Sequence, residues 1–222
     1  MNNTINRNRS FAKLSGYSLL LMAVIAGFSF GYALPKIFKP GQLDFAQSNL
    51  SENLQLYKFM LLGILIVLLL DILVSFTLYI FFKNDNKKWA LLSCILRIIY
   101  SLILGIALYY LAINIGQSNN SIVLKNYKSF QNIWSTGLIV FGIHLLIIGA
   151  LMKLHKLIPG ILWYLSIIAG ASYILIHLLK TTFPQLTELN NNLSNILGLP
   201  MALGELGLAG WLIIKGGKTK LT

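Results

Sequence analysis

The chain has 222 residues, of which 56% are hydrophobic and only 11% charged, and its mean hydropathy is +0.73. This composition excludes a soluble globular domain and predicts an integral membrane protein. The formal net charge of +12 does not indicate nucleic-acid binding, because most of the excess lies beside apolar runs, where anionic lipid headgroups attract it. The lipid bilayer is therefore the expected partner.

Apolar runs long enough to cross a membrane occur six times along the chain. A hydrocarbon core of about 30 Å needs about 20 apolar residues in a helix, and no alternating strand pattern appears. The sequence therefore predicts an all-α bundle of six transmembrane helices. The runs cover residues 14–34, 59–82, 89–112, 132–152, 158–179 and 193–214.

One transmembrane domain over residues 14–217 follows, with a cytoplasmic segment at 1–13 and a cytoplasmic tail at 218–222. Basic residues before the first run and Gly31-Tyr32-Ala33 at its end also fit a cleavable signal peptide. The run is long enough to span, so we interpret it as the first helix, with cleavage as the open alternative.

The two longest connections, 35–58 and 113–131, are predicted as loops on the outer face. Pro40 and Gly41 predict a turn in the first, followed by a short amphipathic helix at 45–56 on the membrane surface. Pro200 predicts either a kink in the last run or a later helix start.

Basic residues outside the runs predict the orientation. Eleven lie on the side of the N-terminus, Lys220 among them, and six on the other side, so both termini are expected in the cytoplasm of a cell with the protein in its inner membrane. All four tryptophans fall near the ends of runs, as expected for interfacial rings. The frequent Asn, Lys and Ile residues suggest a bacterial source.

Known catalytic and cofactor motifs do not occur. The three histidines, His144, His155 and His177, form no HExxH pair, and Cys94 has no second cysteine to pair with. Metal binding would need ligands from separate helices, and a haem between His144 and His177 is the remaining alternative. We therefore expect no cofactor, no metal and no enzymatic activity.

Charged residues inside the runs mark the candidate site. An ion at mid-bilayer costs a few kcal/mol or more, so it persists only when it is paired or has a function. Asp71 and Glu205 lie midway along the second and sixth runs, and Arg97 lies about eight residues into the third. The second and third runs must be antiparallel neighbours, so Asp71 and Arg97 are the expected ion pair, with Arg97 able to fork across the carboxylate. His144 completes the candidate cluster.

Two carboxylates then face one arginine. The excess charge must be neutralised by a proton on Asp71 or Glu205 or by a protonated histidine. A proton-exchanging site and a permanently protonated Glu205 that only donates a hydrogen bond both remain open. Likewise, the Asp71–Arg97 pair can be functional or simply lock two helices together.

Polar residues at helical spacing predict which faces carry this chemistry. Small residues around Glu205 predict close helix packing there. The secondary site candidates are Ser75 on the second run, Tyr100 and Ser101 on the third, and Tyr173 and His177 on the fifth.

A family resemblance adds to this interpretation. Residues 158–162 (IPGIL), Gly170 and Tyr173, Gly204-Glu205, Trp211-Leu212 and Lys215-Gly216 resemble the C-terminal half of bacterial six-helix membrane proteins grouped as domain of unknown function 4386. The resemblance extends over about 13–217 and departs after Tyr173, where three aliphatic residues precede His177. It matches His144 and Gly149 to a histidine and a glycine of the family's fourth helix. It implies that Asp71, Arg97 and Glu205 belong to a shared scaffold, and it implies no activity.

Three function classes follow. The first is a membrane protein whose polar core binds or conducts a small solute, with proton coupling. The alternatives are a structural or assembly partner of another membrane protein, or an intramembrane enzyme on a lipid or quinone with Glu205 or His144 as acid or base. The glycine-rich last run favours the partner role, and a homo-oligomer is also left open.

Overall fold

The computed structural model describes residues 2–39 and 41–218, with the backbone alone for residues 2–7. All regular structure in this part is helical, and six of its helices are long and apolar enough to cross a membrane, which confirms the predicted six-span, all-α architecture. Pro40, Lys220 and the rest of the predicted tail after Lys218 lie outside the described residues.

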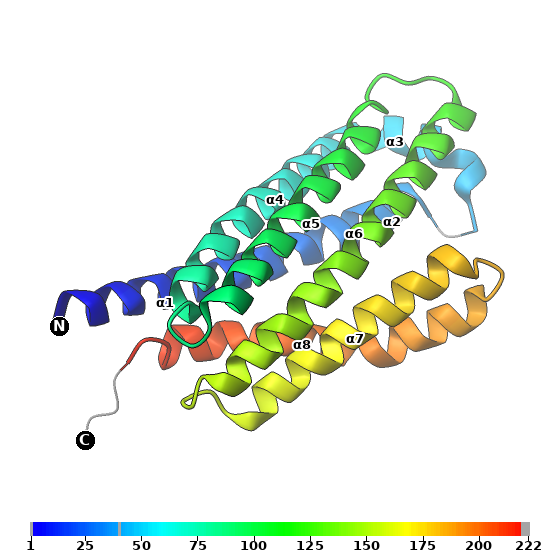
Figure 1. Ribbon diagram of the computed structural model, residues 1–222. Helices are drawn as coiled ribbons and strands as arrows, with labels where there is room; N and C mark the ends of the chain where they lie inside the picture. Colours follow the sequence, from blue (N-terminus) through cyan, green and yellow to red (C-terminus); the bar gives the residue numbers. More distant parts are fainter. Residues whose placement is uncertain (1, 40, 219–222) are drawn as a thin grey trace.

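The spanning helices pack as an up-and-down bundle in which the start of the first helix and the end of the last lie at the same end (Figure 1). Short connections join α4 to α5, α6 to α7, and α7 to α8, so each of these pairs is antiparallel. The later spans are α4 (Leu54–Phe82), α5 (Lys87–Ala112), α6 (Asn120–Leu154), α7 (Gly160–Thr182) and α8 (Thr187–Ile214).

The first span is a single continuous helical segment with a π-helical stretch inside it. Helix α1 (Asn2–Ala26) passes directly into the π-helix η1 (Gly27–Ala33) and then α2 (Leu34–Ile37). Most of the predicted segment 1–13 is therefore helical and continuous with the first span. π-Helical turns re-aim side chains and often lie at functional sites; here the turn carries Phe30, which lines the cavity described below.

Helix α6 is much longer than predicted. It begins at Asn120 instead of 132, so most of the predicted outer loop 113–131 is helix. Its polar composition suggested a loop, but Val123, Tyr127 and Phe130 follow the i, i+4, i+7 spacing of a buried helical face. The Tyr127 ring stacks on Phe38, with ring centroids 3.9 Å apart.

The predicted surface helix at 45–56 is replaced by two shorter elements, η2 (Leu43–Phe45) and α3 (Ala46–Glu52), before α4 begins at Leu54. Helix α3 buries Ala46, Asn49 and Leu50 against the bundle, and the Gln47 backbone N–H donates to Asn120 Oδ1 at 2.9 Å. These side chains therefore cap the end of the bundle that lies away from the termini.

Helix α8 continues through Pro200 from Thr187, so the later start considered for it is wrong. Its C-terminal end is held by Arg9 of α1. The guanidinium donates to the carbonyl oxygens of Leu212 at 3.1 Å, Ile213 at 2.5 Å and Gly216 at 2.6 Å. The last carbonyls of a helix have no partner within it, so Arg9 satisfies them from another helix.

Arg9→Gln is expected to lower the free energy of unfolding by about 1–2 kcal/mol, because charge-assisted hydrogen bonds to the α8 carbonyls are lost. Reversible unfolding in mixed micelles measures the change. Lys13→Gln is the matched control, since it removes a neighbouring positive charge on an exposed side chain without such bonds. Equal effects of the two substitutions would show that the carbonyl contacts contribute nothing beyond charge.

Candidate functional site

The centre of the bundle holds an ion pair between two antiparallel helices. Arg97 of α5 approaches Asp71 of α4, with Nη2 2.6 Å and Nε 2.8 Å from the same carboxylate oxygen, Oδ1. The pair predicted from the sequence is thus confirmed. The predicted fork is wrong, because the guanidinium reaches only one oxygen and uses its third nitrogen elsewhere.

That third nitrogen, Arg97 Nη1, lies 3.2 Å from His144 Nε2 of α6. A guanidinium can only donate, so Nε2 must accept and the proton of the imidazole must sit on Nδ1. Nδ1 lies 2.9 Å from the carbonyl oxygen of Ser93, which accepts it, and 2.9 Å from the Ser93 hydroxyl. The hydrogen bonds therefore fix His144 as a neutral imidazole.

Burial of this cluster is almost complete. Arg97 is the largest side chain among those with under 2% exposure, and Asp71 and His144 are each 1% exposed. The Phe141 ring covers the guanidinium, with Arg97 Cζ 5.3 Å from the ring centroid. One carboxylate, one guanidinium and one neutral imidazole leave the cluster without net charge.

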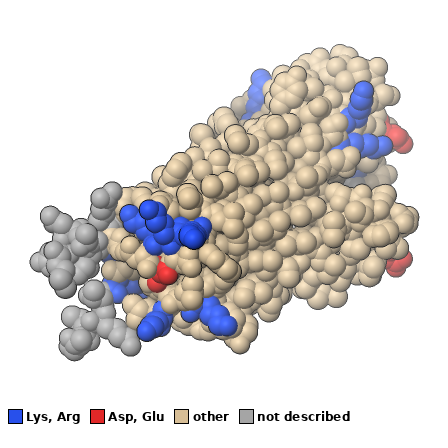
Figure 2. Space-filling view, in the orientation of Figure 1, with Lys and Arg blue, Asp and Glu red and all other residues tan. Residues whose placement is uncertain are grey.

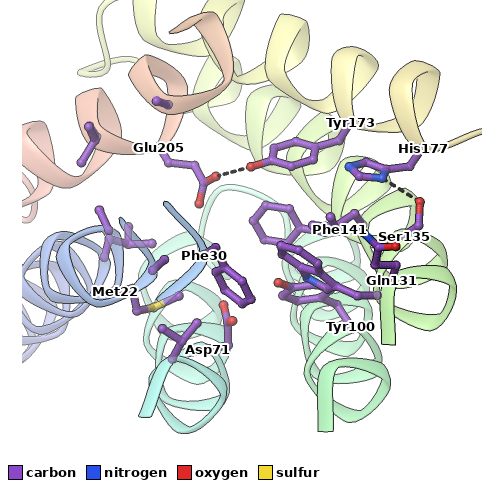
Figure 3. Close-up of a pocket in the computed structure, with 18 of the residues that line it drawn as sticks. Met22, Phe30, Asp71, Tyr100, Gln131, Ser135, Phe141, Tyr173, His177 and Glu205 are labelled. Carbon is purple, nitrogen blue, oxygen red and sulfur yellow. Dashed lines mark hydrogen bonds between the residues drawn. The ribbon is translucent and has the colours of Figure 1, made fainter. Parts of the chain in front are cut away.

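A cavity of about 470 Å³ lies beside this cluster and is bounded by residues of all six spans (Figure 3). Asp71 belongs to both, because it binds Arg97 and lines the cavity. The apolar lining comes mainly from α1, η1 and α6. The polar and charged lining residues are Asp71, Tyr100, Gln131, Trp134, Ser135, Tyr173, His177, Lys180 and Glu205.

Glu205 of α8 points into this cavity (Figure 3). The Tyr173 hydroxyl donates to its Oε1 over a long 3.5 Å. Among the described residues, no Lys, Arg or His lies within 4 Å of the carboxylate. Glu205 thus stands apart from the hydrogen-bonded cluster it was expected to join, although both border a void of about 10 Å³.

Aromatic rings form two groups around the cavity. Phe30 of η1 stacks on Trp134 of α6, with ring centroids 4.3 Å apart. Phe141 contacts Tyr100 at 4.8 Å and meets Tyr173 edge-on at 5.3 Å. In Figure 3 the carboxyl groups of Glu205 and Asp71 face this aromatic space from opposite sides.

The remaining secondary candidates divide into two classes. His177 lines the cavity and its Nδ1 lies 2.8 Å from the Ser135 hydroxyl. Ser75 and Ser101 are buried but donate to carbonyl oxygens of their own helices, at Ile72 and Arg97. The hydroxyl groups of those two serines are therefore satisfied within their own helices, and they do not contribute to the site.

A metal ion needs several ligand side chains placed close together for binding. Within residues 2–39 and 41–218, no group of three His, Cys, Asp or Glu side chains is placed to hold an ion. Both ring nitrogens of His144 are engaged by Ser93 and Arg97, so neither is free for the haem considered from the sequence.

Several cavity residues could not be selected from the sequence. Phe30 lies in the first apolar run, where nothing distinguishes it from its apolar neighbours. Gln131 was assigned to the end of a loop and Ser135 to the start of a helix. Trp134 was expected at the interface, but α6 begins early and places the indole inside the bundle against Phe30. Lys180, counted as a loop charge, lies in the last turn of α7 and lines the cavity.

A sequence model of the family described as Domain of unknown function (DUF4386) matches residues 14–216. The chain belongs to the DUF4386 family. The matched region contains all cavity-lining residues, from Leu19 to Leu206, together with the Asp71–Arg97–His144 cluster. This DUF4386 scaffold therefore includes the complete candidate site.

A relative of the DUF4386 chain occurs in Archaeoglobus fulgidus (strain ATCC 49558 / DSM 4304 / JCM 9628 / NBRC 100126 / VC-16), where it is described as an uncharacterized protein. The two are 29% identical over 166 residues, which cover 75% of this chain and 89% of the relative. No solved structure matches the chain.

Proposed function

We propose that this protein binds a small, mostly apolar molecule in the cavity between its six spanning helices. The observation that carries the proposal is the cavity itself, about 470 Å³ in volume, with aliphatic and aromatic walls between which polar and charged side chains reach the space. Small-molecule sites are typically apolar clefts of about 300–1,000 Å³ in which a few polar groups orient the ligand. The binding site lies within the bilayer.

A binding role is preferred here over a catalytic one. The donors and acceptors of Arg97 and His144 are used within the protein, where they hold α4, α5 and α6 together. Arg97 and His144 therefore support a wall of the cavity and are already bound to partners within the protein. We propose no enzymatic step.

Proton exchange at Glu205 is the second part of the proposal. A carboxylate without a cationic neighbour is costly in apolar surroundings, so a proton or a cation must neutralise it. Binding of a ligand that changes the charge balance of the cavity would therefore make Glu205 take up or release a proton. Solute binding and proton exchange are thereby coupled.

The distribution of charge supports an inner-membrane location with both termini in the cytoplasm. Lys and Arg gather at the end of the bundle where α1 starts and α8 ends (Figure 2). At the other end, Asp44, Glu52 and Glu188 partly balance the positive charge of the Lys residues. The positive-inside rule therefore favours the cytoplasm for the termini.

Ala202→Phe is expected to weaken ligand binding at least tenfold, because its ring would fill the cavity that Ala202 lines. Three probes of similar shape suit the test: neutral neopentylbenzene, cationic benzyltrimethylammonium and anionic phenylmethanesulfonate. Saturation-transfer NMR on protein in nanodiscs measures binding of each. At least one probe should bind the wild type.

Ala171→Phe is the matched control, because Ala171 is exposed on α7 and does not line the cavity. It should bind the probes as the wild type does. The proposal fails if no probe binds the wild type above its level in empty nanodiscs, or if the Ala202 variant binds as tightly as the control.

A further inference from the structure

The charges around the cavity are unbalanced. Of the two carboxylates that line it, Asp71 is neutralised by Arg97, whereas Glu205 has no cation within ion-pair distance among the described residues. Arg97 does not line the cavity and its three nitrogens already contact Asp71 and His144. An ionised Glu205 therefore gives the central part of the cavity one uncompensated negative charge.

Aromatic rings line the same cavity as that negative charge. Tyr173 contacts Glu205 directly and meets Phe141 edge-on, and Phe141 contacts Tyr100. Phe30 and Trp134 add a stacked pair on another wall. An organic cation gains from both features at once, because its charge pairs with the carboxylate and is attracted to ring faces.

An anionic ligand fits the same space poorly. The one lysine that lines the cavity, Lys180, is exposed and lies in the last turn of α7, near the end of the bundle away from the termini. Glu205 lies far from that end, about nine residues from the end of α8 at the termini side. An anion drawn in by Lys180 would thus meet an unpaired carboxylate deeper in the cavity.

We propose that the ligand is an organic monocation, such as an ammonium compound with an apolar or aromatic body, whose charged group pairs with Glu205 among the aromatic rings. This inference rests on the proposed binding function and names the ligand class of the same cavity. The apolar body lies along the α1 and α6 wall, where Met22, Ala26 and Leu138 line the space.

Cation and proton then compete for the same carboxylate. Binding of a permanent cation releases the proton from Glu205, so affinity should fall as the pH is lowered. The titratable and charged groups that face Glu205 are Asp71 of α4, Arg97 and Tyr100 of α5, His144 of α6, and Tyr173 of α7, with His177 and Lys180 further along the cavity. Glu205→Gln should remove the competition.

Glu205→Gln and Lys180→Gln form a matched pair for the test, since each exchanges one cavity charge for the same neutral amide. Binding of benzyltrimethylammonium, neopentylbenzene and phenylmethanesulfonate is measured for the wild type and both variants in nanodiscs at several pH values. We expect the wild type to bind the cation at least tenfold more tightly than its neutral isostere, with lower affinity at acid pH. Glu205→Gln should abolish this preference and its pH dependence. Glu188→Gln, which makes the same exchange at an exposed residue of α8 outside the cavity, is measured in parallel and should keep both.

Other outcomes overturn the inference in distinguishable ways. Equal binding of the cation and the neutral probe, blocked by Ala202→Phe, would contradict the ligand class and leave the binding function standing. Preferential binding of the sulfonate, lost in Lys180→Gln, would assign the cavity to anions. Absence of binding by all three probes would remove the proposed function as well. Glu205→Asp, which keeps the charge, should retain the cation preference and guards against misfolding of the Gln variant.

Discussion

Arg97→Met is expected to lower the free energy of unfolding by about 3–5 kcal/mol, because it leaves the buried Asp71 carboxylate without its counter-ion. His144 Nε2 loses its donor in the same variant. Unfolding in mixed micelles, followed by circular dichroism, measures the loss. This substitution should be the most damaging single change of a side chain in the core.

The double variant Asp71→Leu, Arg97→Met should recover most of that loss, since it removes both charges together. The remaining defect, about 1–2 kcal/mol, reflects the unpaired His144 nitrogen. Ser101→Ala serves as the control, because its hydroxyl bonds only to a carbonyl of its own helix. If the double variant is as unstable as Arg97→Met, packing and not charge explains the effect.

Gly170→Ala is expected to destabilise the protein by about 1–3 kcal/mol through overpacking between α6 and α7. A Cβ atom at Gly170 would lie 2.6 Å from the Gly142 carbonyl oxygen and 2.9 Å from the Leu146 backbone nitrogen. Backbone atoms cannot turn away as side chains can, so the helices must separate. Because α7 carries Tyr173 and His177, ligand affinity should fall together with stability.

Gly198→Ala is the matched control, because a Cβ there meets nothing within 4 Å and the residue also lies inside a helix. Its thermal melting temperature should equal or slightly exceed that of the wild type. Similar losses in both variants would indicate that helix flexibility, and not close packing at Gly170, is what the alanine disturbs. Thermal melting and probe binding on the same samples separate these explanations.

The six-span architecture could be predicted because the length and apolarity of a spanning segment are dictated by the bilayer. Helix ends were predictable where they coincide with the end of an apolar run, as at Phe82, Ala112 and Ile214. Helix α6 continues well beyond its apolar run, and the packing of Phe38 on Tyr127 holds this extension against the rest of the bundle. Composition alone indicates which segments contact lipid. It says little about how residues beyond an apolar run pack against the rest of the bundle.

Part of the candidate site could also be predicted. Asp71 and Arg97 were paired correctly because a short connection forces their helices together. The position of Glu205 depended on how α1, α7 and α8 pack around a space, which no local pattern records. Aromatic residues such as Phe30 and Trp134 look the same in a sequence whether they face lipid or a cavity.

The hydrogen bonds from Arg9 to the end of α8 also affect how the protein folds during synthesis. A ribosome releases the N-terminal helix into the membrane long before Leu212, Ile213 and Gly216 have been synthesised. During that interval Arg9 lacks its final partners, and the side of α1 that later receives α8 at Gly16 faces other molecules. The nascent chain therefore completes this contact only after residues 212–216 have left the ribosome, and truncation near residue 210 should leave the first helix without these partners and exposed to membrane quality control.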